Sequence, residues 1–371
     1  MYNQIREDTL YIIFYTVVTS MALMASFYLL FRRANAIAPD ITPPVRLRRW
    51  AAAFFAAFAL NHVWYMPILF LTSSEDIRLC DLIGGLLDSM TIFPLAIIVL
   101  LTMLQDRRRP LWPVAVMLAP LVAGNTISVA TRSYALLPIL YAYFLLICMG
   151  LMIYMVRALR QYGRWLRDNY ADLEHKELWQ SFIVVAIVLL VFVTYTFIYE
   201  GPTYLYTLLV ITAVLICYLL WRVETLSDLS MPVNDAEDLN ISDKLGRGIS
   251  PNEKFSLSQN IGPLLKKYCE EPQLYLQHDL TLLQLAKAIG INRSYLSKHF
   301  AMQGFTYNAY INGLRIQHFI NLYHEAAATH QPVTAQQLAY QSGFRNYNTF
   351  SAAFKQKMGM NPTEWMPLVK S

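Results

Sequence analysis

Long apolar runs alternate with short charged segments over the first 221 residues of the chain. The first run, Thr9–Phe31, contains 23 residues without a charge, which is more than the roughly 20 that a helix needs to cross a bilayer. It is also too long for a cleaved signal peptide. We therefore expect seven membrane-spanning helices. The other six runs are Trp50–Thr72, Leu82–Leu104, Leu111–Thr131, Ser133–Val156, Trp179–Tyr199 and Pro202–Trp221.

Basic residues between these runs are unevenly distributed, and this predicts the orientation of the spans. The connections after the first, third and fifth runs hold thirteen Lys and Arg residues, whereas the N-terminal tail and the opposite connections hold three. Cytoplasmic loops carry the excess of positive charge in membrane proteins. The N-terminus is therefore expected outside the cell and the C-terminus inside.

The polar and apolar pattern changes near the C-terminus, where one arrangement occurs twice. Each copy has a T-x-x-Q capping box that starts a helix, a glycine that ends it, and a second helix with two apolar residues four positions apart. A further glycine, a helix cap and an aromatic residue close each copy. Each copy is a helix-turn-helix candidate. The residues are Thr281, Gln284, Gly290, Leu296, Phe300, Gly304, Thr306 and Tyr310 in the first copy, and Thr334, Gln337, Gly343, Phe350, Phe354, Gly359, Asn361 and Trp365 in the second.

A stretch with helical spacing of apolar residues, Thr306 to Ala328, separates the copies. A helix of this length is about 30 Å long. It can place two recognition helices in successive major grooves, which lie about 34 Å apart.

The second copy contains three distinctive strings, Leu338-Ala-Tyr-x-x-Gly-Phe344, Tyr347-x-x-Phe-Ser-x-x-Phe-Lys355 and Gly359-Met-Asn-Pro-Thr-Glu-Trp365. Through these strings, residues from about Ser258 to Val369 resemble the DNA-binding domain of AraC-type (AraC/XylS) transcriptional regulators. The resemblance implies an all-α domain in which one monomer reads a bipartite DNA site. With the seven spans, it implies a multi-pass protein of the bacterial cytoplasmic (inner) membrane.

Polar residues on the outer face of each second helix are the candidate DNA contacts, because the N-terminal end of such a helix enters the groove. In AraC-type regulators the positions most often used for base contact correspond here to Ser294, Ser297, Lys298, Asn348, Ser351 and Ala352. Ala352 departs from the frequent polar or basic choice, so the second copy is expected to depend more on phosphate contacts and on Asn348 for adenine. The full set of candidates is Arg293, Ser294, Ser297, Lys298, Arg345, Asn346, Tyr347, Asn348 and Ser351.

Ionisable and amide side chains within the spans are costly and therefore informative. Asn61, His62, Asp88 and Asn125 are all expected in the outer third of the bilayer core. One hypothesis is a ligand pocket open to the outside. The alternative is that these groups only form hydrogen bonds between helices.

These patterns predict three regions: a transmembrane sensor over residues 1–221, a flexible acidic linker over 222–257 and the DNA-binding domain over 258–371. The inner loop Arg157–Trp179 is Arg-rich and aromatic, which favours an amphipathic helix on the lipid surface. Contact of this loop with the DNA-binding domain is the alternative.

The function that we expect is a membrane-tethered, one-component transcriptional regulator. The alternative is a transporter or channel-like protein regulated by its tail. No catalytic pattern, metal-ligand spacing of the four cysteines or cofactor motif is visible, and the first lysine of the chain, Lys176, excludes a retinal Schiff base within a span. Expected partners are double-stranded DNA, the lipid bilayer, a small-molecule or protein signal and RNA polymerase. Homodimerisation stays open, because no sustained heptad repeat lies between Trp221 and Ser258.

Overall fold

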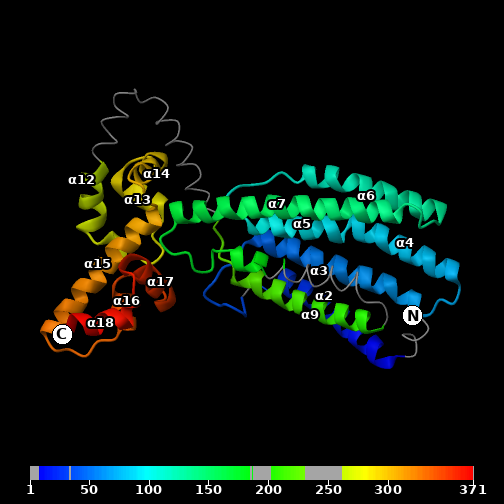
Figure 1. Cartoon of the computed structure of the whole chain (residues 1–371), viewed down its shortest axis with the longest axis horizontal. Helices are drawn as coiled ribbons and strands as arrows, with labels where there is room; N and C mark the ends of the chain where they lie inside the picture. The colour runs from blue at the N-terminus through cyan, green and yellow to red at the C-terminus, as the bar shows by residue number, and fades with distance from the viewer. Residues whose placement is uncertain (1–7, 33–34, 184–185, 187–201, 230–260, 371) are drawn as a thin grey trace, which may run out of the picture. The chain divides into compact units, whose positions relative to one another are not determined.

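Helices form the regular structure of the described part of the chain, as the sequence predicts, and no strand occurs there (Figure 1). The computed structural model describes residues 8–32, 35–183, 186, 202–229 and 261–370. The chain divides into two units. Unit 1 comprises residues 1–162 and 178–230, and unit 2 comprises residues 163–177 and 231–371.

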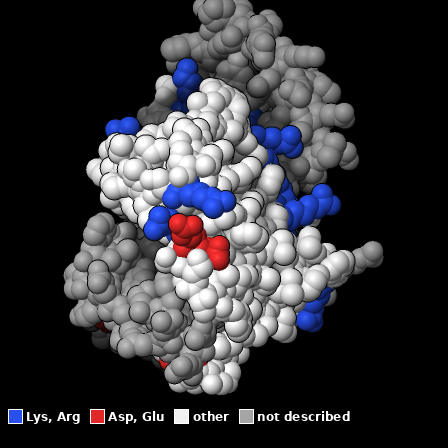
Figure 2. Space-filling model, turned by 90° about the vertical axis from the view of Figure 1, so that its right-hand side faces the viewer, with Lys and Arg blue, Asp and Glu red and all other residues white. Residues whose placement is uncertain are grey.

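Unit 1 is a bundle of long apolar helices. Helix α2 packs against α3 and α9, α3 packs against α5, and α4 packs against α6. Many large apolar side chains on these helices are exposed, such as Met24 and Ile139, at 70% and 66%. Figure 2 shows a face on which uncharged residues dominate and charged side chains form only small groups. The helices are α2 (Thr9–Phe31), α3 (Val45–Tyr65), η1 (Met66–Leu69), α4 (Ser74–Met90), α5 (Ile92–Met103), α6 (Trp112–Thr131), α7 (Leu137–Asn169) and α9 (Pro202–Thr225).

Six segments of the described residues are helical, long and apolar enough to cross a membrane. They correspond to six of the seven expected spans. Most of the remaining one, expected at 179–199, lies outside the described residues. The third span differs from expectation, because it is interrupted at Thr91 between α4 and α5. Pro94 explains the break: its ring clashes with the carbonyl group four residues earlier, and Met90 is the residue at which α4 ends.

The beginning of the expected linker also differs from the prediction, because α9 continues to Thr225 and the chain stays packed in unit 1 as far as Leu229. The Glu224 carboxylate is buried, pairs with Arg48 at 3.1 Å and accepts a hydrogen bond from Tyr28 Oη at 3.2 Å. Leu226 is fully buried. These contacts fix residues that acidic composition alone predicts to be flexible. The linker from 230 to 257 lies outside the described residues.

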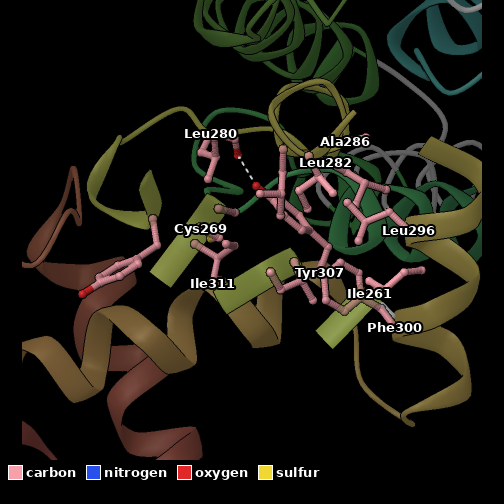
Figure 3. Close-up of a cluster of buried hydrophobic side chains, with 14 residues drawn as sticks. Ile261, Cys269, Leu280, Leu282, Ala286, Leu296, Phe300, Tyr307 and Ile311 are labelled. Atoms are coloured by element: carbon pink, nitrogen blue, oxygen red, sulfur yellow. Dashed lines mark hydrogen bonds between the residues drawn. The ribbon is translucent and has the colours of Figure 1, made fainter. Parts of the chain in front are cut away.

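Unit 2 contains two apolar clusters joined by one long helix, α15 (Tyr307–Ala328). The first half of α15 contributes Tyr307 and Ile311 to the first cluster (Figure 3). Its second half contributes Phe319 and Tyr323 to the second cluster. The other helices are α12 (Ile261–Leu265), η2 (Lys266–Glu270), η3 (Leu274–Leu276), α13 (Leu282–Ile289), α14 (Arg293–Met302), α16 (Ala335–Gln341), α17 (Tyr347–Met358) and α18 (Pro362–Lys370).

Burial fixes the chemistry of the first cluster. The Tyr307 hydroxyl donates a hydrogen bond to the Leu280 carbonyl at 3.1 Å (Figure 3). Burial raises the pKa of Tyr307, so this hydroxyl stays a neutral donor. Burial also raises the pKa of Cys269 to about 12, which keeps its thiol protonated and unreactive. The cluster is therefore structural rather than reactive.

Both predicted capping boxes are present, and both start the first helix of a helix-turn-helix. The Thr281 amide donates to Gln284 Oε1 at 2.8 Å and the Gln284 amide donates to Thr281 Oγ1 at 3.2 Å. The equivalent distances at Thr334 and Gln337 are 3.1 and 3.2 Å. These reciprocal bonds satisfy backbone donors that have no partner within the helix. The duplication read from the sequence is therefore a duplication of structure.

The two copies end their first helices differently. Gly290 is the C-cap of α13 and adopts a left-handed conformation with φ of +80°. In the second copy Ser342 is the C-cap of α16, and Gly343 follows with φ of +86°. The second helix also begins one residue later in the second copy, so the turn before it is longer. Gly343 lies against Leu276, in the short helix η3 of the other half of unit 2.

Replacement of Gly343 by alanine should destabilise unit 2 more than the equivalent change at Gly290. Both substitutions place a side chain at positive φ, which costs about 1–2 kcal/mol. At Gly343 the new Cβ would also lie 2.7 Å from Leu276 Cα and 2.8 Å from its carbonyl oxygen, whereas nothing lies within 4 Å at Gly290. The additional cost is about 1–3 kcal/mol, the usual range for overpacking.

The measurement is hydrogen–deuterium exchange of the full-length protein, followed in peptides from α13 and α16. Gly343→Ala should accelerate exchange in α16 by more than Gly290→Ala accelerates it in α13. Equal effects would contradict the close approach of Gly343 and Leu276.

Candidate nucleic-acid interface

Helix α14 presents the candidate DNA contacts of the first copy. Asn292 is its N-cap, and the Asn292 side chain accepts a hydrogen bond from the Ser294 amide at 2.7 Å. Leu296 and Phe300 are buried in the first cluster. Ser294 and Lys298 are exposed on the outer surface, and Ser297 is half-buried. The helix therefore has a core side and a polar side, as the sequence predicts.

Helix α17 repeats this arrangement in the second copy. Asn346 is its N-cap and accepts a hydrogen bond from the Asn348 amide at 2.6 Å. Asn348 and Ala352 are exposed, and Ser351 is half-buried. Tyr347 differs from the other candidates, because it packs against the second cluster, with its ring centroid 5.8 Å from that of Phe350.

Arg345 lies just before α17 and is exposed. Its guanidinium lies 3.5 Å from the Asp279 carboxylate, and both side chains are solvent-accessible. An exposed ion pair of this kind contributes little to stability. Arg345 can therefore exchange Asp279 for a phosphate group at low cost.

Charge and spacing are compatible with a duplex. Residues 258–371 carry ten Lys and Arg against five Asp and Glu. Helix α15 has 22 residues, which makes it about 33 Å long. That length matches the separation of successive major grooves on one face of DNA, about 34 Å.

Comparison with known proteins agrees with this geometry. Residues 285–367 match a helix-turn-helix domain family. The matched region begins within α13, ends within α18 and includes α14 and α17. It supports DNA-binding transcription regulation of the AraC type. No curated protein and no solved structure matches the chain.

Arg315 is a further important residue that the sequence pattern does not single out, and its side chain is only 1% exposed. The guanidinium donates hydrogen bonds to the carbonyl groups of Tyr275 at 2.7 Å and Gln277 at 2.6 Å, and a longer one to His278 at 3.2 Å. It also lies 5.6 Å from the centroid of the Phe344 ring. Burial lowers the pKa of Arg315, and the carbonyl oxygens compensate for the lost water.

Arg315 affects the candidate interface indirectly, by holding other residues in place. It lies on α15 between the two apolar clusters, and its hydrogen bonds hold the turn from Tyr275 to His278. In this turn, His278 Nδ1 lies 3.0 Å from the Gly343 carbonyl oxygen. The two helix-turn-helix copies are thereby connected by more than α15 alone. The only sequence signal was a basic residue on an otherwise apolar helix face, between Ile311 and Phe319.

The end of the inner loop, residues 163–177, belongs to unit 2. The sequence favoured a lipid-surface helix for the region Arg157–Trp179, with contact to the DNA-binding domain as the alternative. In the structure α7 continues to Asn169, and Ala171 is buried in the first cluster of unit 2. For residues 163–177 the structure therefore favours the alternative. Small apolar Ala171 and the amide-rich surface of α15 explain the difference, since neither produces a visible pattern in the sequence.

The polar residues of unit 1 do not all gather in one place. Asn61 Nδ2 donates a hydrogen bond to Asp88 Oδ1 at 2.9 Å, and Tyr65 Oη donates to Asp88 Oδ2 at 2.9 Å. Thr91 also accepts from Asn61, at 3.1 Å. Tyr65 and Thr91 were not anticipated. The Asp88 carboxylate is thus satisfied by two neighbouring side chains.

The other two candidates for the ligand pocket make different contacts. The His62 ring packs between the rings of Tyr15 and Phe58, at centroid distances of 4.9 and 4.1 Å. Asn125 donates a hydrogen bond to the Gly85 carbonyl at 3.4 Å. Interhelical hydrogen bonding, the alternative raised by the sequence, accounts for the Asn61, Asp88 and Asn125 contacts.

Two adjacent glycines in α4 allow a direct test of the Asp88 cluster. A Cβ at Gly84 would lie 2.3–2.5 Å from the outer atoms of the Tyr65 ring, whereas a Cβ at Gly85 would meet nothing within 4 Å. Gly84→Ala should therefore displace Tyr65 from Asp88 and destabilise unit 1 by about 1–3 kcal/mol relative to Gly85→Ala. The pair shares the same gain in helix propensity, so that contribution cancels.

The readout is the thermal unfolding midpoint of detergent-solubilised full-length protein. A lower midpoint for Gly84→Ala than for Gly85→Ala is expected. Identical midpoints would show that the Tyr65–Asp88 bond does not hold α3 and α4 together.

Proposed function

We propose that this protein is a membrane-tethered, one-component transcriptional regulator that binds DNA through α14 and α17 of a single chain. Its matching helix-turn-helix region supports DNA-binding regulation. The observation that supports binding by a single chain is the pair of helices α14 and α17. Each is capped by an asparagine, and α15, which joins them, is about as long as one turn of DNA.

In this proposal unit 1 anchors the chain in the bacterial cytoplasmic membrane, with the N-terminus outside and unit 2 in the cytoplasm. Six apolar helices and the excess of Lys and Arg on one side support this arrangement. Tethering keeps the DNA-binding unit at the membrane surface. A signal received by unit 1 and contact with RNA polymerase complete the proposed scheme.

The proposed DNA contacts combine positively charged side chains with uncharged polar ones. Lys298 and Arg345 are exposed cations that suit phosphate groups or guanine, and Asn348 is an exposed amide that suits adenine. Ser294, Ser297 and Ser351 supply shorter polar contacts beside them. Arg293 and Asn346 lie at the ends of the helices that enter the groove.

The test is DNA binding by the full-length protein in lipid nanodiscs, with fluorescent 40-bp duplexes of random sequence. Affinity should fall steeply as salt rises from 50 to 200 mM, because phosphate contacts release counterions. Lys298→Ala should weaken binding to all duplexes by about tenfold and reduce the salt slope by about one. Asn348→Ala should instead alter which sequences are enriched from the pool.

The matched control is Lys266→Ala, which removes the same charge from an exposed position outside both recognition helices. It should change affinity by less than about twofold. Absence of salt-dependent binding by every form of the protein, or equal losses for Lys298→Ala and Lys266→Ala, would contradict the proposed interface.

A further inference from the structure

Residues 163–177, which we call the 163–177 segment, contact the N-terminal ends of both recognition helices. The Arg293 guanidinium, at the first position of α14, donates a hydrogen bond to Asn169 Oδ1. Asn346, the N-cap of α17, donates from Nδ2 to Glu174 Oε1 at 2.7 Å. These are the ends that helix-turn-helix proteins insert into the major groove. One short segment therefore engages both candidate DNA-reading elements.

The segment is anchored by backbone contacts that do not involve the recognition helices. Tyr170 forms an antiparallel bridge with Thr281. Asn308, on α15, donates hydrogen bonds to the carbonyl groups of Ala171 at 2.6 Å and Tyr170 at 3.3 Å. Ala171 itself is only 1% exposed within the first cluster. The segment is thus held in place by the buried Ala171 side chain and by hydrogen bonds to the carbonyl groups of Tyr170 and Ala171.

The segment carries a negative charge, as the DNA backbone does, at the point where it contacts α17. The Glu174 carboxylate lies at the N-cap of α17, and the N-terminus of a helix favours an anion there through its free amides and its dipole. A phosphate group of DNA would compete with Glu174 for the same helix end. Asp172 is buried at 5% exposure and accepts a hydrogen bond from the Glu174 amide at 3.0 Å, which helps to hold Glu174 in place.

We propose that the 163–177 segment is an autoinhibitory cap that competes with DNA for the N-terminal ends of α14 and α17. This proposal rests on the proposed function, because a cap can mask only a surface that binds DNA. Arg293 and Asn346 cannot hold the segment and insert into the groove in the same geometry. DNA binding therefore requires the segment to leave, and its departure exposes both helix ends together.

The position of the segment in the chain suggests what releases it. It includes the last turn of α7, an apolar helix of unit 1 over most of its length, and the chain returns to unit 1 at Leu178. A signal that shifts the end of α7 would strain the contacts of Asn169 and Tyr170. A change in unit 1 would thus alter the balance between the capped and the DNA-bound states. A ligand can cause such a shift only if it binds one of the two states more tightly than the other.

The test uses full-length protein in nanodiscs and the same random 40-bp duplexes at constant salt. Asn308→Ala removes the two anchoring hydrogen bonds without altering either recognition helix, and Glu174→Ala removes the carboxylate from α17. Each should tighten DNA binding by about 5- to 20-fold. A merely structural role of Asn308 would instead leave affinity unchanged or lower it.

Two matched controls accompany these variants. Asn321→Ala alters an exposed asparagine on the same helix as Asn308, and Glu325→Ala removes an exposed carboxylate from α15. Both should change affinity by less than about twofold. If Glu174→Ala and Glu325→Ala tighten binding equally, net charge rather than capping is responsible and the proposal fails.

A disulfide lock tests the same contact in the opposite direction. Residues facing each other across an antiparallel bridge have Cα atoms about 4.5–5.5 Å apart, within the range that a disulfide spans. The double variant Tyr170→Cys/Thr281→Cys should crosslink on oxidation, as mass spectrometry of the linked peptide would show. The oxidised form should bind DNA at least tenfold more weakly than the reduced form, with Thr281→Cys alone unaffected by oxidant.

The outcomes separate the two proposals. If no form of the protein binds any duplex, the proposed function and the cap both fail. If wild-type protein binds DNA in a salt-dependent way but the Asn308, Glu174 and locked variants bind equally well, only the cap fails. Failure of the cysteine pair to crosslink would also overturn the cap, because it would show that Tyr170 and Thr281 do not lie side by side.

Discussion

The arrangement of unit 2 depends on one buried cation, Arg315. Removal of a guanidinium from water is costly, and here carbonyl oxygens from Tyr275 to His278 offset that cost. In return, the turn that carries these carbonyls is fixed against α15 and reaches Gly343, in the second helix-turn-helix. This link adds to the connection that α15 provides between the two halves. In the proposed function, binding to two grooves depends on the separation of α14 and α17, and the Arg315 contacts that support this separation lie away from the proposed DNA surface.

Local signals made much of this fold predictable, and tertiary contacts explain most of what was missed. The capping boxes at Thr281 and Thr334 and the left-handed glycines act within a few residues, and so they are visible in the sequence. The role of Arg315 depends on a turn about forty residues away, and the seating of Ala171 depends on a surface more than one hundred residues away. Neither leaves a periodic pattern. The contacts of the His62 ring were similarly unpredictable, because the sequence shows its place in an apolar run but not which helix it faces.

Polar side chains find their partners differently in the two units. In unit 2 exposed amides and hydroxyls remain on the outer faces of α14 and α17, where water or a ligand can satisfy them. In unit 1 the Asp88 carboxylate accepts hydrogen bonds from Asn61 and Tyr65, and Glu224 forms an ion pair with Arg48 and accepts a hydrogen bond from Tyr28. Unsatisfied polar groups within a bilayer are expensive. The polar side chains of unit 1 therefore hold helices together: the Asp88 contacts join α3 to α4, and the Glu224 contacts join α9 to α2 and α3.

In the proposed function, one chain binds two successive major grooves at a spacing set by α15 and Arg315. Hydroxyl-radical footprinting of the full-length protein, on the duplex most strongly enriched from a random pool, distinguishes this arrangement from binding by two chains. We expect two protected patches on one face of the DNA, with centres about 10–10.5 bp apart, at a protein concentration where one chain is bound per duplex. A single patch, or two patches that appear only when two chains bind, would contradict it.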